Sequence, residues 1–258
     1  MKQLDKLKVK IFADGADLAG IMALYRNPLI SGFTTNPTLM RNASVSDYEE
    51  FARRLLQAVP DRPISIEVFA DDFSEMEAQA MEIASWGGMV NVKIPVTTTQ
   101  GESSAAVVKR LSRAGVRPNV TALMTLRQVQ EIADCLDSSA HAYISVFAGR
   151  VADTGRDPLP MMTEAVQCLR AYPHIELIWA SPRELLNVFQ ADVIGCHVIT
   201  VTHDILKKLK LIGKDLNEYS LETVQMFYND ARKAGFELRR SKVIGEFSST
   251  PASTMTMD

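Results

Sequence analysis

The chain has 258 residues, 47% of them hydrophobic and 23% charged, which is ordinary for a globular protein with one large domain. The formal net charge of −3 gives no general basic surface for nucleic acid, and no apolar run reaches the roughly 18 residues of a membrane span. Three widely separated cysteines, Cys135, Cys168 and Cys196, argue against a disulfide framework and against a zinc site. Together with a charged N-terminal segment that lacks a secretory signal, they favour a reducing, cytoplasmic location.

Eight short apolar runs alternate with segments of helical composition such as SEMEAQAMEIAS and SAAVVKRLSRAG. A strand followed by a helix, repeated, predicts βαβ units and a parallel sheet, and eight repeats predict an α/β fold of the closed (β/α)8 TIM-barrel type. The alternative is an open doubly wound sheet, which usually carries a glycine-rich phosphate loop after its first strand, whereas the sequence there is FADGAD. The predicted strands are Val9–Asp14, Ile30–Asn36, Ile64–Ala70, Val90–Val96, Pro118–Leu123, Ala142–Gly149, Ile175–Ala180 and Val198–Thr202.

An extra C-terminal helix is predicted after the eighth repeat. The segment GKDLNEY is expected to be a linker, and Ser220 is expected to cap a helix that ends at Gly235. We therefore expect a catalytic barrel over residues 1–215, a C-terminal helix within 216–240 that packs on the barrel or on a neighbouring subunit, and a disordered tail over 241–258.

Side-chain alternation along the predicted strands turns polar groups toward the inside of the barrel. In VNVKIPV the valines and the isoleucine share one face, which suits the surrounding helices, so Lys93 points inward. The same argument turns Glu67 inward in ISIEVFA, and in PNVTAL it puts Asn119 and Thr121 on the face opposite Ala122. The other members of this predicted interior set are Asp14 at the end of the first strand, Thr34 and Asn36 in the second, Ser145 and Phe147 in the sixth, and Arg150 just beyond the sixth.

Charged groups inside a barrel are costly unless they are paired or functional, and catalytic residues of this fold stand at the C-terminal ends of the strands. The interior set therefore predicts a catalytic site, with a purely structural Lys93–Glu67 ion pair as the alternative. Asn36 taken alone is better explained as a turn residue, while Asp17 is better placed than Asp14 to cap the first helix. No two histidines have metal-ligand spacing, so no metal is expected.

Six segments resemble the transaldolase family in their order and spacing, namely FADGAD, GFTTNPTL, NVKIPVT, PNVTALMT, ISVFAGRV and ASPR. The resemblance extends from about residue 8 to residue 235, the pairing of TTNP with VKIPVT is highly specific, and the chain length resembles the shorter branch, which includes the fructose 6-phosphate aldolases. The resemblance implies a Schiff-base lysine at Lys93, an acid/base at Asp14, and a catalytic water held by Glu67 and Thr121. It also implies substrate-binding roles for Asn36, Asn119, Thr34 and Ser145 at the donor and for Arg150, Ser181 and Arg183 at the phosphate.

Sugar phosphate substrates, no cofactor, and assembly into a homo-oligomer are further implications of the resemblance. Glu67 and the substrate-contacting Phe147 stand where the family's aldolases typically have Gln and Tyr. This favours a transaldolase of the pentose phosphate pathway, which moves a dihydroxyacetone unit from fructose 6-phosphate or sedoheptulose 7-phosphate to an aldose phosphate.

Three alternatives stay open, and a departure from the family at Pro182 supports one of them, an enzyme of a specialised sugar biosynthesis. Pro182 replaces the usual Phe, and because proline fixes φ and removes an N–H, a different phosphate geometry is expected at Ser181 and Arg183. The alternatives are a fructose 6-phosphate aldolase, a transaldolase-like enzyme of a specialised sugar biosynthesis, and a barrel that binds sugar phosphates without turnover.

Overall fold

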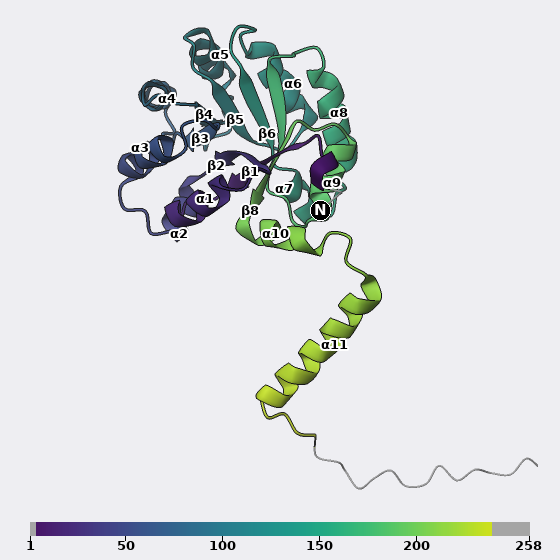
Figure 1. Cartoon of the computed structure of the whole chain (residues 1–258). Coiled ribbons are helices and arrows are strands. Elements are labelled where there is room, and N and C mark those ends of the chain that lie inside the picture. Colours follow the sequence, from purple (N-terminus) through teal and green to yellow (C-terminus); the bar gives the residue numbers. More distant parts are fainter. Residues whose placement is uncertain (1–3, 239–258) are drawn as a thin grey trace, which may run out of the picture. The chain divides into compact units, whose positions relative to one another are not determined.

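The computed structural model describes residues 4–238 of the chain. The chain divides into two compact units, Met1–Ile212 and Gly213–Asp258. In the first unit eight parallel strands pair in sequential order, and β1 closes the sheet by pairing with β8. Helices connect the strands and surround them (Figure 1). The predicted (β/α)8 TIM barrel is therefore confirmed.

The strands agree closely with the predicted runs, and most end sooner than predicted because the chain turns into a loop or helix. For example, β2 ends at Thr34 since Asn36 already caps the helix that Pro37 begins. The strands are β1 (Lys10–Asp14), β2 (Ile30–Thr34), β3 (Ile64–Glu67), β4 (Val90–Pro95), β5 (Pro118–Leu123), β6 (Ala142–Val146), β7 (Ile175–Trp179) and β8 (Val198–Thr202).

The helices between and after these strands follow the predicted alternation, with a short 3₁₀ segment before β1 and another after the last barrel helix. The helices are α1 (Leu18–Tyr25), α2 (Pro37–Asn42), α3 (Tyr48–Ala58), α4 (Phe73–Ser85), α5 (Ala105–Arg113), α6 (Leu126–Cys135), α7 (Ala148–Asp153), α8 (Leu159–Leu169), α9 (Leu186–Val193) and α10 (His203–Lys207). None of the helices that the structure describes is both long and apolar enough to cross a membrane.

The barrel wall separates two apolar clusters. The larger cluster lies between strands and helices and includes Val90, Val92 and Ile94 of β4, as alternation predicts. The smaller cluster fills the barrel interior with Phe12, Tyr143, Ile178, Ala180 and Val198. Because several of its members precede polar interior residues by two positions on the same strand, an apolar layer supports a polar layer nearer the C-terminal ends of the strands.

β5 contains an irregularity that alternation alone did not predict. Its register with β6 shifts between Val120 and Leu123, and Ala122 has a φ of +66°, a left-handed conformation that is unusual for alanine. Leu123, rather than Ala122, therefore joins Val120 in the apolar cluster outside the barrel. Bulges of this kind re-aim side chains at barrel rims, and here the residue just before the bulge is Thr121.

The second unit contains α11 (Leu216–Lys233), whose N-cap is Asp215. The Asp215 carboxylate accepts hydrogen bonds from the backbone N–H of Asn217 at 2.9 Å and of Glu218 at 3.0 Å. The predicted cap at Ser220 is therefore wrong, because Asp is as good an N-cap as Ser and begins the helix earlier, inside the segment expected to be a linker.

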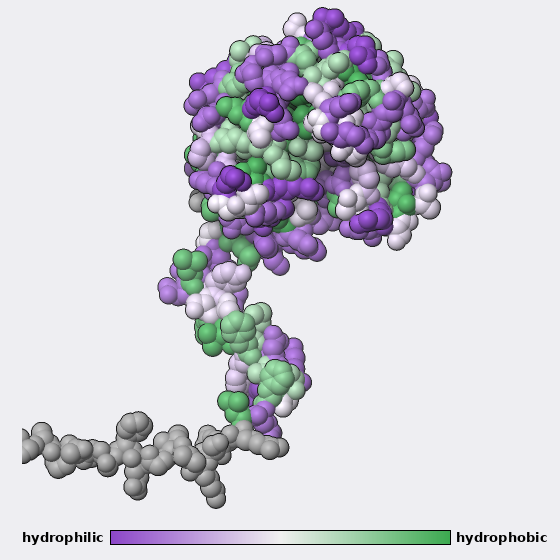
Figure 2. All heavy atoms as spheres, turned by 180° about the vertical axis from the view of Figure 1, so that it is seen from behind, coloured by the Kyte–Doolittle hydropathy of each residue, from purple (hydrophilic) through white to green (hydrophobic). Residues whose placement is uncertain are grey.

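The predicted end of α11 is confirmed, since the helix stops before Gly235, which has a φ of +66°. Apolar residues are exposed along its length and appear as green spheres in Figure 2; Leu221 is 58%, Val224 60% and Phe227 64% exposed. The tail predicted over 241–258 lies outside the described residues.

Candidate active site

A pocket of about 150 Å³ opens among the residues that end the barrel strands. Side chains from both halves of the chain line it, because the barrel is closed and brings the ends of all its strands together. Every predicted site residue except Glu67 and Asn119 lines it. The lining residues are Asp14, Thr34, Asn36, Lys93, Thr121, Ser145, Phe147, Arg150, Ala180, Ser181, Pro182, Arg183, Thr200 and Thr202.

Lys93 lies on β4 with a side chain that is only 7% exposed. Its Nζ donates to Oε2 of Glu67 at 2.8 Å and to the backbone oxygen of Thr35 at 2.9 Å. Glu67 is opposite Lys93 in the β3–β4 register, so strand pairing itself brings the two charges together. Burying such a pair costs desolvation free energy. The Lys93 side chain also lines the pocket, so this cost is met at a place where a ligand could reach the nitrogen.

Asp14, at the end of β1, accepts a hydrogen bond from the hydroxyl of Thr34 at 2.8 Å. Burial raises the pKa of its carboxyl above the ordinary value, although the nearby positive charge of Lys93 opposes the rise. Asp14 does not cap α1, because Asp17 accepts from the first backbone N–H groups of that helix. A raised pKa suits a group that takes up and returns a proton near neutral pH.

Thr121 presents an unsatisfied hydroxyl to the pocket. Its Oγ1 is buried and has no hydrogen-bond partner within the described part of the chain. Buried polar atoms are normally hydrogen-bonded, so this hydroxyl is suited to bind a water molecule or a ligand group.

Asn119 lies beneath the pocket rather than in its wall. It is fully buried, its amide nitrogen donates to Oγ of Ser65 at 2.9 Å, and its amide oxygen accepts from the hydroxyl of Ser145 at 2.7 Å. Both ends of the amide are thus occupied, and the side chain orients Ser145, which does line the pocket.

Asn36 has two roles in the structure at once. Its side-chain oxygen accepts from the backbone N–H of Leu39 at 3.0 Å and caps α2, which matches the turn interpretation. The residue also lines the pocket, where its amide nitrogen is available as a donor.

The rim of the pocket carries two arginines in different states. The Arg150 guanidinium lies 5.1 Å from the centre of the Phe147 ring. Arg183 forms a two-point ion pair with Asp153, with its Nε 2.8 Å from Oδ1. Its Nη1 also donates to the backbone oxygen and the hydroxyl of Ser181 at 3.1 and 3.0 Å. Arg150 is therefore the more available cation of the two.

The loop that carries Pro182 is conformationally constrained. Ser181 has a φ of +60°, which costs a non-glycine residue free energy, and its carbonyl oxygen would be only 1.5 Å from a Cβ at Gly149. Glycine at the start of α7 is therefore required for this close approach.

Sequence reasoning missed three residues around the pocket. Thr200 and Thr202 line it, and Oγ1 of Thr200 is 2.5 Å from that of Thr34. Alternation in VITVT could have found both, because Ile199 and Val201, which alternate with them, face the helices. Asp153 could not be found this way, since it lies on a helix and meets Arg183 only through the fold.

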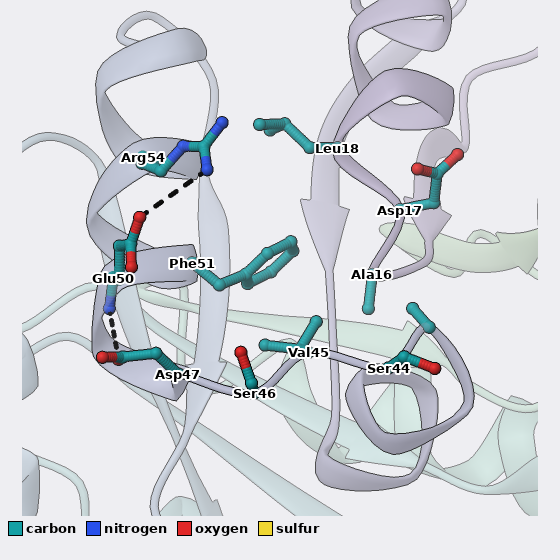
Figure 3. A pocket seen from close by; sticks show the side chains of 11 residues that line it. Ala16, Asp17, Leu18, Ser44, Val45, Ser46, Asp47, Glu50, Phe51 and Arg54 are labelled. Carbon is teal, nitrogen blue, oxygen red and sulfur yellow. Dashed lines mark hydrogen bonds and ion pairs between the residues drawn. The ribbon is translucent and has the colours of Figure 1, made fainter.

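A larger pocket of about 340 Å³ lies elsewhere, between the start of α1 and the α2–α3 loop. Figure 3 shows the Glu50 side chain pointing toward Arg54, and the Asp47 side chain pointing toward the backbone N–H of Glu50. Asp17 and Asp47 cap α1 and α3, and Glu50 pairs with Arg54 at 3.7 Å. These groups explain the local structure, and none of them is a buried titratable group like Lys93 or Asp14.

Comparison with known proteins gives a consistent result. A family model described as transaldolase/fructose-6-phosphate aldolase matches residues 11–243. A "Probable transaldolase" of Dehalococcoides mccartyi is 33% identical over 202 residues, which cover 78% of this chain and 90% of the relative. Another of that name, from a Thermoanaerobacter species, is 32% identical over 231 residues, or 89% of this chain and 100% of the relative.

Solved structures resemble this chain in fold. The structure of 2,3-dimethylmalate lyase, a member of the PEP mutase/isocitrate lyase superfamily, aligns with a TM-score of 0.50 and 12% identity, over 95% of this chain and 90% of that one. At this identity the likeness concerns the barrel alone.

Proposed function

This chain belongs to the transaldolase/fructose-6-phosphate aldolase family, and from that premise we propose that it is a transaldolase. The proposed reaction transfers a dihydroxyacetone unit from a ketose phosphate, fructose 6-phosphate or sedoheptulose 7-phosphate, to an aldose phosphate in the pentose phosphate pathway. The observation that carries the proposal is the position of Lys93, a buried amine that faces a polar pocket and lies 2.8 Å from a carboxylate.

The proposed reaction begins with attack of the Lys93 amine on the C2 carbonyl of the donor. Only the deprotonated amine is a nucleophile, and the Glu67 carboxylate at 2.8 Å is the acceptor within reach of its proton. The resulting carbinolamine loses its hydroxyl group as water, and an iminium ion forms. The unsatisfied hydroxyl of Thr121 supports a role, with Glu67, in holding the water that leaves here and returns in the last step.

Cleavage of the C3–C4 bond then requires a base for the C4 hydroxyl proton. Asp14 takes this proton in the proposed mechanism, and its raised pKa is consistent with holding it. The electrons of the breaking bond move to the iminium nitrogen and give an enamine, and the aldose phosphate leaves as an aldehyde. Since the nitrogen is the electron sink, this reaction calls for neither a metal nor an organic cofactor.

Transfer is completed when the enamine carbon attacks the aldehyde of an aldose phosphate. Asp14 returns its proton to the new hydroxyl group, and water hydrolyses the iminium ion to release the product and Lys93. The groups proposed to bind the hydroxyl groups of the three-carbon unit are Asn36, Thr34, Ser145 and, beneath Ser145, Asn119.

The phosphate group is proposed to bind at the rim. Arginine suits this role because its charged N–H groups match phosphate oxygens. Arg150 is proposed as the principal ligand, with Ser181 beside it. Arg183 contributes less to the charge of the site, because Asp153 already neutralises it.

Product analysis tests the proposal and separates transfer from aldol cleavage. The protein is incubated with fructose 6-phosphate, with and without erythrose 4-phosphate, and the products are separated. Sedoheptulose 7-phosphate that forms only with the acceptor supports a transaldolase. Free dihydroxyacetone released at a comparable rate without the acceptor contradicts it and indicates a fructose 6-phosphate aldolase, so that Glu67 and Phe147 would not distinguish the two activities.

Assembly and location complete the proposal. We propose that α11 packs against another subunit in a homo-oligomer, because it exposes apolar residues such as Val224 and Phe227, and exposed apolar patches mark interaction sites. Sedimentation velocity should give a smaller species for Val224→Glu/Phe227→Glu than for the wild type, and equal sizes would contradict the packing. We also propose a cytoplasmic location, which the free state of the three cysteines supports.

A further inference from the structure

The end of β3, where Glu67 stands, lacks a neighbouring strand on one side. β2 pairs with β3 only through Phe33 and Thr34, because the chain turns into α2 afterwards. β4 continues beside β3, and the backbone N–H of Val68 donates to the oxygen of Lys93 at 3.0 Å. Backbone groups of successive strand residues point to opposite sides, so the N–H and C=O of Glu67 point to the side that β2 has left.

Tyr48, the first residue of α3, occupies that side. Its hydroxyl accepts from the backbone N–H of Glu67 at 3.0 Å and donates to the backbone oxygen of the same residue. One side-chain oxygen thus satisfies both backbone groups of Glu67, as a strand would do. The Tyr48 ring packs edge-on against Phe69, with 5.3 Å between ring centres.

The chemical state of Tyr48 suits this double contact. Burial raises the pKa of the phenol above its usual range, and the charge of Glu67 raises it further. The hydroxyl therefore remains protonated over the working range of pH, and it can donate and accept at the same time. Phenylalanine would fill the same space and make neither hydrogen bond.

We propose that Tyr48 is a positioning residue for the Schiff-base chemistry, which fixes the Glu67 carboxylate against Lys93 by clamping the backbone of Glu67 at the unpaired end of β3. The inference rests on the proposed function. Tyr48 does not line the pocket and acts only through Glu67. The Glu67 carboxylate accepts a hydrogen bond from Nζ of Lys93 at 2.8 Å. A small displacement of the Glu67 backbone would therefore move the carboxylate that is proposed to transfer the protons of imine formation.

The variant that tests this is Tyr48→Phe, compared with the matched control Tyr25→Phe. Tyr25 also makes a hydroxyl hydrogen bond, to Asp61 at 2.7 Å, but it lies outside the pocket lining. For Tyr48→Phe we expect kcat to fall roughly 10- to 100-fold, as small misplacements of catalytic groups do, with little change in KM for the donor. The pH–rate profile should also shift, which loss of stability alone would not cause. Tyr25→Phe should match the wild type in both.

A double-mutant cycle makes the test specific to Glu67. If Tyr48 acts through Glu67, Tyr48→Phe should have no further effect on kcat in a Glu67→Gln background. Additive effects would overturn the proposal. Should Tyr48→Phe fail to fold, Phe69→Leu provides the second test, since Phe69 is 63% exposed. Phe69→Leu loosens the contact between the Phe69 and Tyr48 rings. It should therefore shift the pH–rate profile in the same direction as Tyr48→Phe but by a smaller amount, and an unchanged profile would overturn the proposal.

Borohydride trapping separates this inference from the proposed function. Wild-type protein treated with fructose 6-phosphate and borohydride should gain a covalent adduct at Lys93, and Tyr48→Phe should gain it more slowly. A wild type that forms no adduct would overturn both proposals. A wild type that is trapped, alongside a Tyr48→Phe variant with unchanged trapping rate and pH–rate profile, would overturn the positioning role alone.

Discussion

Replacing Lys93 with methionine is the most informative single perturbation of the pocket, because it changes both chemistry and stability. The variant should form no borohydride adduct. It also leaves the Glu67 carboxylate without its partner at 2.8 Å, in a site where that side chain is only 16% exposed. Removing one partner of a buried ion pair costs about 3–5 kcal/mol of unfolding free energy. Because Glu67 keeps some contact with solvent, we expect Lys93→Met to lose about 2–3 kcal/mol.

The loss should come from the charge left on Glu67, because a buried charge without a partner is destabilising. Lys93→Met/Glu67→Gln removes the orphaned charge and should recover most of the loss at neutral pH.

Urea unfolding at pH 7.5, followed by circular dichroism, measures these differences in stability. Lys207→Met is the matched control, since its partner Asp204 lies at 3.3 Å on an open surface and such pairs contribute less than about 1 kcal/mol. The reasoning would be refuted if Lys93→Met were as stable as the wild type at pH 7.5. It would also be refuted if Lys93→Met/Glu67→Gln were no more stable than Lys93→Met.

Three further predictions follow from the charges in and below the pocket. Asp14→Asn should lower kcat by roughly 10²- to 10⁴-fold, the usual contribution of a general base, while borohydride still traps Lys93 in the variant; loss of trapping would place Asp14 in imine formation instead. Arg150→Ala should raise KM for phosphorylated substrates by roughly tenfold or more and leave cleavage of an unphosphorylated ketose nearly unchanged, and equal effects on both substrates would exclude a phosphate contact. For Glu176, burial raises the pKa, but hydrogen bonds from His141 and Lys10 outweigh it and lower the pKa from 4.5 to about 2. The stability that these two contacts provide is therefore present above pH 4.5 and lost as the pH falls toward 2. The loss should be roughly 1–2 kcal/mol after allowance for solvent screening. In acid titrations, the unfolding free energies of Glu176→Gln and the wild type should converge at low pH.

The fold was accessible from the sequence because each barrel strand is a short apolar run bounded by helical composition, and because a period of two residues sorts inner from outer side chains. Lys93 and Glu67 were assigned to the interior in this way. Where the period is interrupted, the argument fails, and Ala122, at the bulge in β5, is the example. At α11 the difficulty was chemical, since Asp215 and Ser220 are both good caps and only the structure distinguishes them.

Alternation gives the face of a strand on which a residue lies but not what its side chain contacts. It put Asn119 on the inner face of β5, and only the structure shows that its amide is bonded to Ser65 and Ser145; the substrate-binding role that the family resemblance implies for Asn119 stays a prediction. The ion pair between Asp153 and Arg183 joins residues 30 positions apart, and no local pattern indicates it. Such contacts depend on how helices and loops are placed on the barrel, which is a tertiary property.

The arrangement of layers in the barrel explains how a polar pocket can be held rigid in this fold. Phe12 precedes Asp14 by two positions, and Tyr143 precedes Ser145 in the same way. Each polar side chain thus stands directly above a packed aromatic residue on the same strand, so its backbone is fixed by strand pairing and by the apolar layer below. Glu67 differs, because the strand pairing on one side of it has ended. The Tyr48 hydroxyl takes the place of the missing strand at that point, and we therefore expect a residue outside the pocket to change the chemistry inside it.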